Sequence, residues 1–221
     1  MTIREAIRTR HSVRQYREQP LEPACAAALE EAIARINREA GLRFQLVLNE
    51  PKAFSSFLAH YGRFRGVSNY FALVGPDGPE LDEKCGYYGE ELVLLAQTLG
   101  LNTCWVQLTY KKIPGAFEVG PGERLTVVIA VGYGKNQGVP HRNKAVEKLY
   151  RADGEIPDWF RAGMESALLA PTAVNQQRFL LTLSGREVRA EALRGPCTKI
   201  DLGIVKYHFE QGAGRENFEW I

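Results

Sequence analysis

The sequence predicts an α+β fold, because segments with helical periodicity are interspersed with short runs typical of strands. The clearest helical segment places Leu92, Leu95, Ala96 and Leu99 on one face, and the clearest strand is the apolar run over 124–132. The chain has 221 residues, of which 45% are hydrophobic and 24% are charged. This is the ordinary composition of a globular protein, and the chain is long enough to bury a substantial core.

Helices and strands can be assigned in order along the first two thirds of the chain. Ile3 and Ile7 lie on one face of a short N-terminal helix, and Gly41 has the position of a C-terminal cap on the second helix. The expected elements are helices over 2–10, 24–38 and 85–99, strands over 43–48 and 67–75, a loop leading into a short strand over 102–108, and a central strand over 124–132.

The last third of the chain echoes part of the first. The matching pairs are helices over 24–38 and 157–169, strands over 43–48 and 178–183, and helices over 88–96 and 201–209. The third pair is followed by a tryptophan in both copies, Trp105 or Trp220. We interpret the pattern as a degenerate internal duplication, with halves 1–150 and 151–221 packed as one compact unit. A chance match between short helix–strand units is the alternative.

Composition argues against several classes of protein. No apolar run approaches the roughly 18 residues of a membrane helix, and a net charge of +2 gives no indication of nucleic acid as a partner. The four cysteines form neither a CxxC motif nor a Cys/His cluster, so no metal site is expected. Since no secretory signal is visible, we expect a cytoplasmic protein with reduced thiols.

The sequence lacks the motifs of several other enzyme classes. Nucleophile-elbow, HExxH and Walker motifs are missing from the sequence, which argues against hydrolase and phosphotransfer chemistry. Gly132-Tyr-Gly134-Lys-Asn-Gln-Gly138 approaches a dinucleotide-binding pattern, but its last glycine comes one place late and no helix begins there. His60 and His208 have no triad-like neighbours, and both are expected to be structural histidines.

Three short motifs carry groups that can bind a ligand. The first, Arg10-His11-Ser12-Val13-Arg14, can bind a phosphate by charge-assisted hydrogen bonds, although a solvated surface turn is the alternative. The second, over 170–177, is a Pro-, Thr- and Asn-containing loop that can contact the edge of a planar heterocycle, or be an ordinary connection. The third, over 100–108, is a glycine-led turn that can present backbone N–H groups, or pack a buried tryptophan.

Taken together, the motifs resemble the FMN-dependent nitroreductase superfamily, in particular a branch of smaller nitroreductases. The resemblance spans nearly the whole chain. The matching positions are Arg10, His11, Ser12 and Arg14 in the opening signature, Gly100, Leu101, Thr103 and Trp105 in the middle, Gly132 and Tyr133 at the end of the central strand, the basic pair Arg142 and Lys144, and Ala170, Pro171, Thr172, Asn175 and Gln177 in the late loop.

The resemblance implies a nitroreductase-like fold, with a mixed central sheet covered by helices on both faces, and a set of cofactor-binding residues. Arg10, His11, Ser12, Arg142 and Lys144 would hold the phosphate and ribityl end of FMN, and Arg14 would lie near the flavin ring. A backbone N–H of Gln107 or Leu108 would contact flavin N5, while Pro171, Thr172 and Asn175 would close over the pyrimidine side. Asn69 and Phe71 are weaker candidates for lining the acceptor pocket.

One departure from the family pattern bears on the oligomeric state. In common family members the Pro-Ser-x-x-Asn loop follows the first long helix and reaches the flavin of the partner subunit. Here that position, over 34–41, lacks the pattern, and the loop occurs near the C-terminus instead. A duplicated chain could therefore be a monomeric pseudo-dimer with one complete FMN site, rather than an obligate homodimer.

The implied activity is the reduction of small organic acceptors, such as nitro compounds or quinones, with NAD(P)H in a ping-pong mechanism. No side chain is expected to be catalytic, because the cofactor carries the chemistry. The main alternative is an FMN-binding storage or redox-sensing protein without efficient turnover. A second alternative keeps the fold but uses the reduced cofactor for another reaction, such as dehalogenation or cleavage of the flavin itself.

Overall fold

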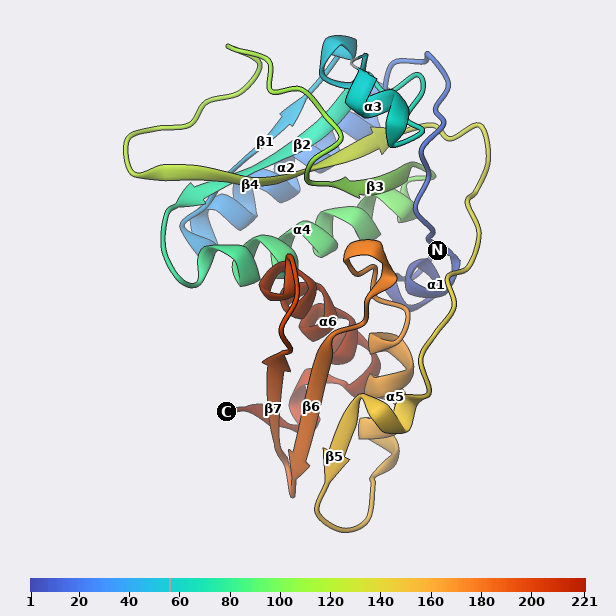
Figure 1. Ribbon diagram of the computed structural model, residues 1–221, viewed down its shortest axis with the longest axis vertical. Helices are drawn as coiled ribbons and strands as arrows, with labels where there is room; N and C mark the ends of the chain where they lie inside the picture. Colours follow the sequence, from blue (N-terminus) through green and yellow to red (C-terminus); the bar gives the residue numbers. More distant parts are fainter. Residues whose placement is uncertain (56) are drawn as a thin grey trace. The chain divides into compact units, whose positions relative to one another are not determined.

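Figure 1 shows the computed structural model, which describes residues 1–55 and 57–221. The chain forms two compact units. The antiparallel-sheet unit comprises Arg10–Leu81 and Leu92–Val139, and the mixed-sheet unit comprises Met1–Thr9, Asp82–Glu91 and Pro140–Ile221. The division therefore differs from the expected halves 1–150 and 151–221, because an N-terminal helix and part of a central helix pack with the C-terminal elements.

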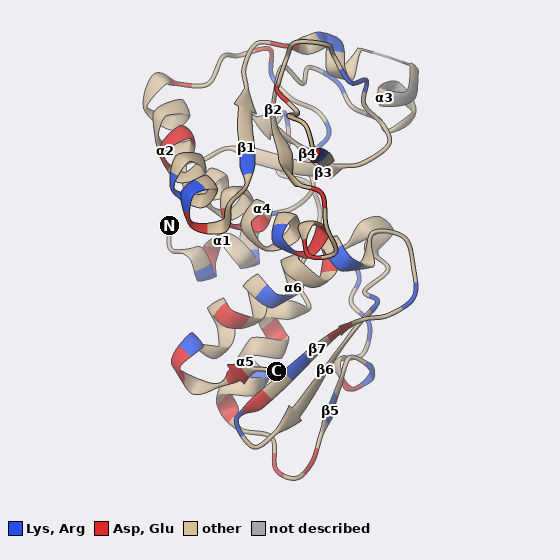
Figure 2. Cartoon of the chain, turned by 90° about the vertical axis from the view of Figure 1, so that its left-hand side faces the viewer, with Lys and Arg blue, Asp and Glu red and all other residues tan. Residues whose placement is uncertain are grey.

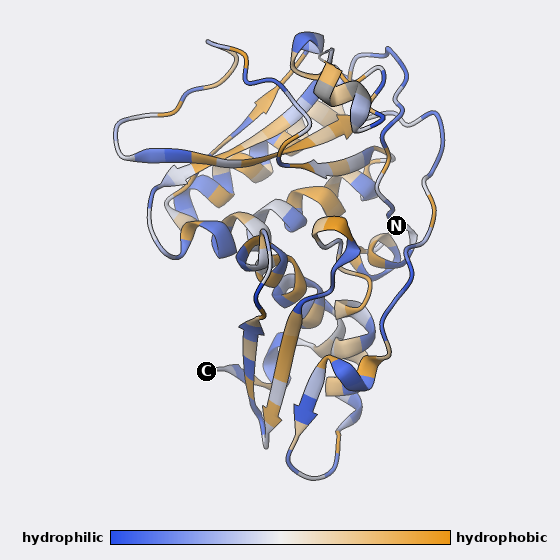
Figure 3. Cartoon of the chain, in the orientation of Figure 1, coloured by the Kyte–Doolittle hydropathy of each residue, from blue (hydrophilic) through white to orange (hydrophobic). Residues whose placement is uncertain are grey.

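The antiparallel-sheet unit is built on four strands. They are β1 (Arg43–Val47), β2 (Asn69–Pro76), β3 (Asn102–Val106) and β4 (Glu123–Gly132). Their order is β1-β2-β4-β3, and every neighbouring pair is antiparallel. The central strand β2 is buried over all but its last residue, and its middle part is hydrophobic in Figure 3. The predicted central position of β4 is confirmed.

Helical segments cover both faces of this sheet, as expected for the fold class. Figure 1 shows α2 (Pro23–Ala40) and α4 (Leu81–Thr98) on one side and α3 (Phe57–Tyr61) on the other, where η1 (Pro51–Phe54) also packs. Pro23 begins α2, where its missing N–H leaves no intrahelical bond unmade, and Gly41 ends it in the left-handed conformation with φ of 66°. The predicted cap at Gly41 is confirmed.

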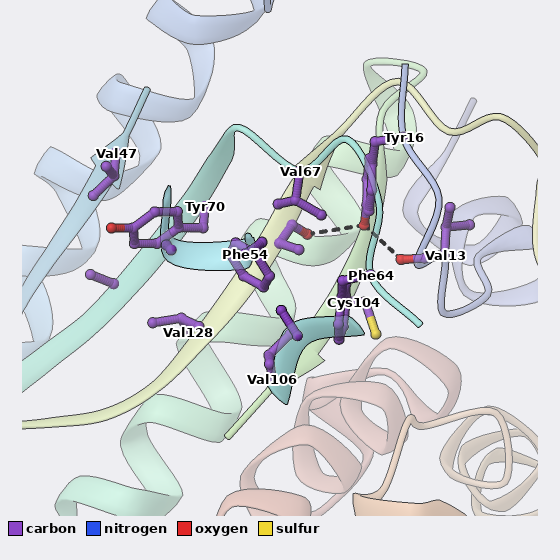
Figure 4. Close-up of a cluster of buried hydrophobic side chains, with 14 residues drawn as sticks. Val13, Tyr16, Val47, Phe54, Phe64, Val67, Tyr70, Cys104, Val106 and Val128 are labelled. Atoms are coloured by element: carbon purple, nitrogen blue, oxygen red, sulfur yellow. Dashed lines mark hydrogen bonds between the residues drawn. The ribbon is translucent and has the colours of Figure 1, made fainter. Parts of the chain in front are cut away.

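One core of the unit lies on the α3 side of the sheet (Figure 4). Side chains of alternate strand residues, such as Tyr70 and Ala72, pack there against Phe54 and Phe64. Tyr16 is buried in the same core, and its hydroxyl donates a 2.8 Å hydrogen bond to the carbonyl of Val13. The N-terminal segment that carries the basic motif is therefore anchored to the sheet.

The mixed-sheet unit contains the other four strands. They are β5 (Tyr150–Ala152), β6 (Phe179–Ser184), β7 (Glu187–Ala192) and β8 (Glu219–Trp220), in the order β5-β6-β7-β8. The pairs β5–β6 and β7–β8 are parallel, whereas β6–β7 is antiparallel. Alternate residues of β6, including Leu181, are buried, and in β7 the buried residue is Val188. Charged residues mark the opposite face of β7 in Figure 2.

The helices of this unit are α1 (Ile3–Thr9), the first part of α4, α5 (Asp158–Ala167) and α6 (Thr198–Ala213), with short 3₁₀ turns η2 (Val146–Lys148), η3 (Ala173–Asn175) and η4 (Arg215–Asn217). Helix α6 is buried on most of its surface and packs against α5, α1 and the sheet. This requirement for partners on several sides explains why α1 and residues 82–91 join the C-terminal elements.

Helices α4 and α6 approach closely through one glycine from each. A Cβ on Gly86 would lie 2.0 Å from the carbonyl oxygen of Ile200, and a Cβ on Gly203 would lie 2.0 Å from that of Glu83. Each glycine thus meets the residue three positions before the other. The contact is reciprocal, as it would be across a twofold axis.

The α+β class is confirmed, and the structure divides the expected mixed sheet into one antiparallel and one mixed sheet. The assigned helices and strands are present, although α4 begins at Leu81 and β3 begins directly at Asn102. Strands β5, β7 and β8 were not anticipated. Apart from η1 and α3, the order α2-β1-β2-α4-β3 matches the order α5-β6-β7-α6-β8. In each series the first two strands are antiparallel, and the last strand, which carries Trp105 or Trp220, is parallel to the second.

No helix among the described residues is both long and apolar enough to span a bilayer.

Candidate functional site

The basic motif Arg10–Arg14 lies along the edge of the antiparallel sheet. The N–H of Val13 donates to the carbonyl of Thr103 over 3.0 Å, and Ser12 forms a parallel bridge with Thr103. Further along, the carbonyl of Arg14 accepts a 2.9 Å bond from the N–H of Arg65. The motif is therefore held in an extended form by backbone bonds on both sides, rather than lying in a solvated surface turn.

The side chains of this motif differ in their exposure. Arg10 is buried, His11 and Ser12 are partly buried, and Arg14 is exposed. The Ser12 hydroxyl hydrogen-bonds the thiol of Cys104, whose pKa is raised by burial and lowered to a smaller extent by Arg14, Ser12 and Arg10. Cys104 is thus a neutral core thiol, and the charge of the segment comes from its arginines.

Two glycines allow another loop to approach the basic motif. A Cβ on Gly138 would lie 2.7 Å from the Cβ of His11 and 3.1 Å from the carbonyl oxygen of Ser12. Gly134 is equally confined, since its N–H donates a 3.0 Å bond to Oδ1 of Asn102 and a Cβ there would overlap that oxygen. The glycine-rich run that fails as a dinucleotide motif is therefore a packing element. The sequence alone assigned no role to Asn102. The closely spaced glycines over 132–138 were the one feature of the sequence that pointed to this packing.

The other candidates in this unit occupy different environments. Asn69 is buried, and its Oδ1 accepts a 3.1 Å bond from the N–H of Asn49. Gln107 and Leu108 are exposed directly after β3. Phe71 has no exposed surface and belongs to the core of β2. Its assignment to an acceptor pocket is therefore corrected, because side chains alternate along the strand and this one points into packed protein.

In the mixed-sheet unit the late loop has an unusual backbone. Val174, Asn175 and Gln177 have φ values of 46°, 54° and 43°, in the left-handed region that favours glycine. Val174 is β-branched and 91% exposed, so no burial of its side chain compensates for the strain. Strained conformations of this kind persist only when surrounding contacts fix them, and they cluster at functional sites. The loop therefore has a strained backbone that contacts with the surrounding structure must hold in place.

The late loop and the basic pair are joined by hydrogen bonds. Gln177 is buried, its Oε1 accepts a 2.7 Å bond from the N–H of Lys144, and its carbonyl accepts a 2.9 Å bond from the Lys144 ammonium. Nδ2 of Asn175 donates a 2.8 Å bond to the carbonyl of Arg142. The Thr172 hydroxyl accepts from the N–H of Gln177 over 3.0 Å. Two motifs about thirty residues apart in the sequence thus form one structure.

Asp201 supports the same loop from helix α6, and sequence reasoning missed it. Its Oδ1 accepts a 2.9 Å bond from the N–H of Ala173, and its Oδ2 accepts a 2.7 Å bond from Nε2 of Gln176. Asp201 is buried, which raises the pKa of its carboxyl group to about 6 against the lowering effect of these two bonds. A lone aspartate inside an apolar helical segment was the available signal.

The structure thus forms two groups from the predicted residues. Arg10, His11, Ser12 and Arg14 lie together at the edge of β3, and Arg142, Lys144, Pro171, Thr172 and Asn175 lie in the joined loops of the mixed-sheet unit. A cavity of about 450 Å³ in the antiparallel-sheet unit is lined by other residues, including Phe54, Arg65 and Asn49. The described residues contain no group of three or more His, Cys, Asp or Glu side chains that could hold a metal ion.

Comparison with known proteins decides the family. The family model described as "Putative TM nitroreductase" matches residues 2–213. The chain belongs to this nitroreductase family. The match extends over both compact units, so the two groups of candidate residues occur within one family domain. No curated protein sequence matches the chain.

Solved structures show the same nitroreductase fold. A "putative nitroreductase" of Thermotoga maritima has a TM-score of 0.67 and 23% identity, over 95% of this chain and 82% of its own. A nitroreductase of Desulfovibrio desulfuricans, solved in complex with FMN, has a TM-score of 0.55 and 18% identity, over 71% of this chain and 99% of its own. A protein of Bacteroides thetaiotaomicron, described as an NADH dehydrogenase/NAD(P)H nitroreductase, has a TM-score of 0.52 and 17% identity, over 66% and 95%.

Proposed function

We propose that this nitroreductase-family protein is an FMN-dependent oxidoreductase that uses NAD(P)H to reduce small organic acceptors. The observation that carries the proposal is that the late loop and the basic pair, both family motifs, are hydrogen-bonded to each other. Gln177 bonds Lys144, and Asn175 bonds Arg142. A strained, exposed loop held against a basic segment is suited to a ligand that is both planar and anionic. The FMN complex of the Desulfovibrio protein supports the choice of cofactor.

Each group, taken by itself, offers donors that fit a phosphorylated cofactor. Arg10, Ser12 and Arg14 offer guanidinium and hydroxyl groups along an extended segment, and guanidinium groups bind phosphate in a bidentate manner. Arg142 is exposed, and the Lys144 ammonium keeps donors beyond the one that it gives to Gln177. When bound, FMN supplies the hydride and electron transfer chemistry. The side chains bind and orient it, and none has to act as a nucleophile.

Arg14 is the residue with the strongest expected effect on the cofactor's charge. Its side chain is exposed at the edge of the sheet. Two unit charges about 4 Å apart near a protein surface attract by roughly 4 kcal/mol before desolvation is subtracted. We therefore assign Arg14 to stabilising negative charge on the cofactor ring, and Arg10 with Ser12 to binding the phosphate.

We further propose that the chain works as a monomeric pseudo-dimer. The reciprocal contact of Gly86 with Ile200 and of Gly203 with Glu83 supports this, because a contact of one surface with its own copy has this form. The matching order and direction of elements in the two units is a second, independent support. The hypothesis requires one FMN per chain, and light scattering of the flavin-loaded protein tests it. An obligate dimer with interfacial flavins contradicts it.

The activity is tested by a visible spectrum of the freshly purified protein, followed by anaerobic titration with NADH and NADPH. The expected results are a flavin spectrum, bleaching by at least one nicotinamide, and return of the colour when a quinone or nitroarene is added. Steady-state rates at several acceptor concentrations should give parallel double-reciprocal lines, as a ping-pong mechanism requires.

Two other results point to different functions. A bound flavin that no nicotinamide bleaches supports a storage or sensing protein instead. A colourless protein whose melting temperature FMN does not raise contradicts cofactor binding altogether.

A further inference from the structure

We propose that Asp201 is the positioning residue that holds the Pro171–Gln177 loop in the conformation that binds FMN. The inference rests on the proposed binding of FMN by that loop. It adds a residue that lies outside the loop, on helix α6, and that matches none of the family motifs.

The loop needs support from outside itself. Three of its residues have positive φ values, and the exposed side chain of Val174 makes no compensating core contact. Bonds within the loop, such as those from the Asn175 N–H to the Thr172 carbonyl and from the Gln177 N–H to the Thr172 hydroxyl, close the turn. The bonds from Gln177 and Asn175 to other segments reach Lys144, Arg142 and Leu168. None of these bonds fixes Ala173 or Gln176 relative to α6, and that constraint has to come from α6 itself.

Asp201 supplies it with both carboxylate oxygens. Oδ1 accepts from the N–H of Ala173 and Oδ2 accepts from Nε2 of Gln176, and these two residues flank Val174 and Asn175, two of the three strained positions. The same Nε2 also donates a 2.7 Å bond to the carbonyl of Pro196, in the turn that leads into α6. Since a carboxylate is only an acceptor, and both partners are donors, the geometry suits the ionised form.

The position of Asp201 makes the constraint rigid. The residue is 3% exposed in the first turn of α6, and its own N–H is bonded to the carbonyl of Cys197. Burial disfavours the charge and raises the pKa of this carboxyl group to about 6, so at neutral pH the ionised group depends on the loop donors. Charge-assisted bonds in a buried site are stronger than bonds between neutral groups.

The test uses Asp201→Asn in the full-length protein. The new amide has the size of the carboxylate but presents an NH₂ group to one of the two donors, so one bond is replaced by a donor–donor contact. We expect the Kd for FMN, measured by quenching of flavin fluorescence, to rise about tenfold or more, as for the loss of a bond to a charged group. We also expect the amide of Ala173 to exchange faster with solvent, even without FMN.

Two control variants separate positioning from general stability. Val205→Ala removes buried volume from the same helix, and should lower the melting temperature without changing the Kd for FMN or the exchange at Ala173. Asp153→Asn changes an exposed aspartate of the same unit and should change none of these quantities. At saturating FMN, kcat of Asp201→Asn should remain close to that of the wild type, because the residue acts on binding of the cofactor.

A second variant keeps the inference testable if Asp201→Asn does not fold. Gln176→Ala removes one donor and should raise the Kd for FMN in the same direction. In the double variant the effects should be less than additive, because both substitutions remove the same contact.

The outcomes distinguish this inference from the proposed function. A wild-type protein that binds no FMN contradicts both. A wild-type protein that binds FMN, together with unchanged Kd values in Asp201→Asn and Gln176→Ala, overturns only the role of Asp201.

Discussion

Replacement of Gly203 by alanine tests the close contact between helices α4 and α6. The added Cβ would lie 2.0 Å from the carbonyl oxygen of Glu83 and 2.6 Å from the backbone nitrogen of Tyr87, whereas ordinary contacts begin near 3.4 Å. The obstacles are backbone atoms of a helix, so no rotamer change relieves the overlap. The two helices would have to separate by about 1.4 Å at this point.

The expected cost follows from this displacement. Overpacking of a well-packed core costs typically 1–3 kcal/mol, and a displacement of more than 1 Å between two backbones belongs at the upper end, about 3 kcal/mol. For a chain of this size each kcal/mol lowers the melting temperature by roughly 2–4 °C, so we expect a decrease of roughly 6–12 °C. Calorimetry or circular dichroism measures it directly.

The matched control is Gly78→Ala. At Gly78 a Cβ would meet no atom within 4 Å, so the melting temperature should stay unchanged or rise slightly. Gly86→Ala should reproduce the effect of Gly203→Ala, and the double variant should lose less than the sum, because helices that have already separated accommodate the second methyl group. Equal melting temperatures of Gly203→Ala and Gly78→Ala would refute the close approach and the reciprocal contact built on it.

Three further predictions follow from the structure. His208→Leu should lower the free energy of unfolding, measured by urea titration, by about 3–5 kcal/mol. The reason is that Nε2 of His208 lies 2.8 Å from Oε1 of Glu90 and both side chains are fully buried. A loss below about 1 kcal/mol would contradict a buried polar pair. Burial raises the pKa of the Asp201 carboxyl from its ordinary value of 3.8 to about 6, so between these pH values the folded protein binds more protons than the unfolded chain. The contribution of this group to stability should therefore fall, by at most about 3 kcal/mol, as the pH rises from about 4 to about 6. Asp201→Asn should remove this dependence, and an unchanged pH profile in the variant would argue against the shift. Gly138→Ala should weaken FMN binding, because the added Cβ would displace His11. The control Gly115→Ala has a similar φ of 78° but open space around it, so it should lower stability without changing the Kd for FMN. Equal Kd values in the two variants would contradict the role of close packing at the basic motif.

The buried polar pair also completes one expectation from the sequence. His208 is a structural histidine, with Nδ1 3.0 Å from the carbonyl oxygen of Ser166 and Nε2 facing Glu90. The absence of triad-like neighbours in the sequence was a sufficient basis for this prediction. The hydrogen-bond partner of His208 could not be predicted from the sequence, because Glu90 lies more than a hundred residues earlier in the chain. The side chain of His60, for which the same role was expected, lies outside the described part of the structure.

Local patterns determined the elements that carry their own signal. Apolar spacing predicted α4, and the echo of its sequence over 201–209 predicted α6. A proline and a glycine marked the two ends of α2, and a continuous apolar run identified β4 as central. Strands β5, β7 and β8 were missed, because they are short or polar on one face and exist through pairing with neighbours. Pairing depends on residues distant in the sequence, which periodicity does not report.

The same distinction applies to the candidate site. By itself the sequence determined which residue types gather in the basic motif and in the late loop, and hence the kind of ligand to expect. Only the tertiary structure decided that Gln177 joins the loop to Lys144, that Phe71 lies in the core, and that Asp201 holds the loop from α6. The physical reason is that a motif consists of residues close together in the sequence. Hydrogen bonds and burial depend instead on which distant segments the fold brings into contact.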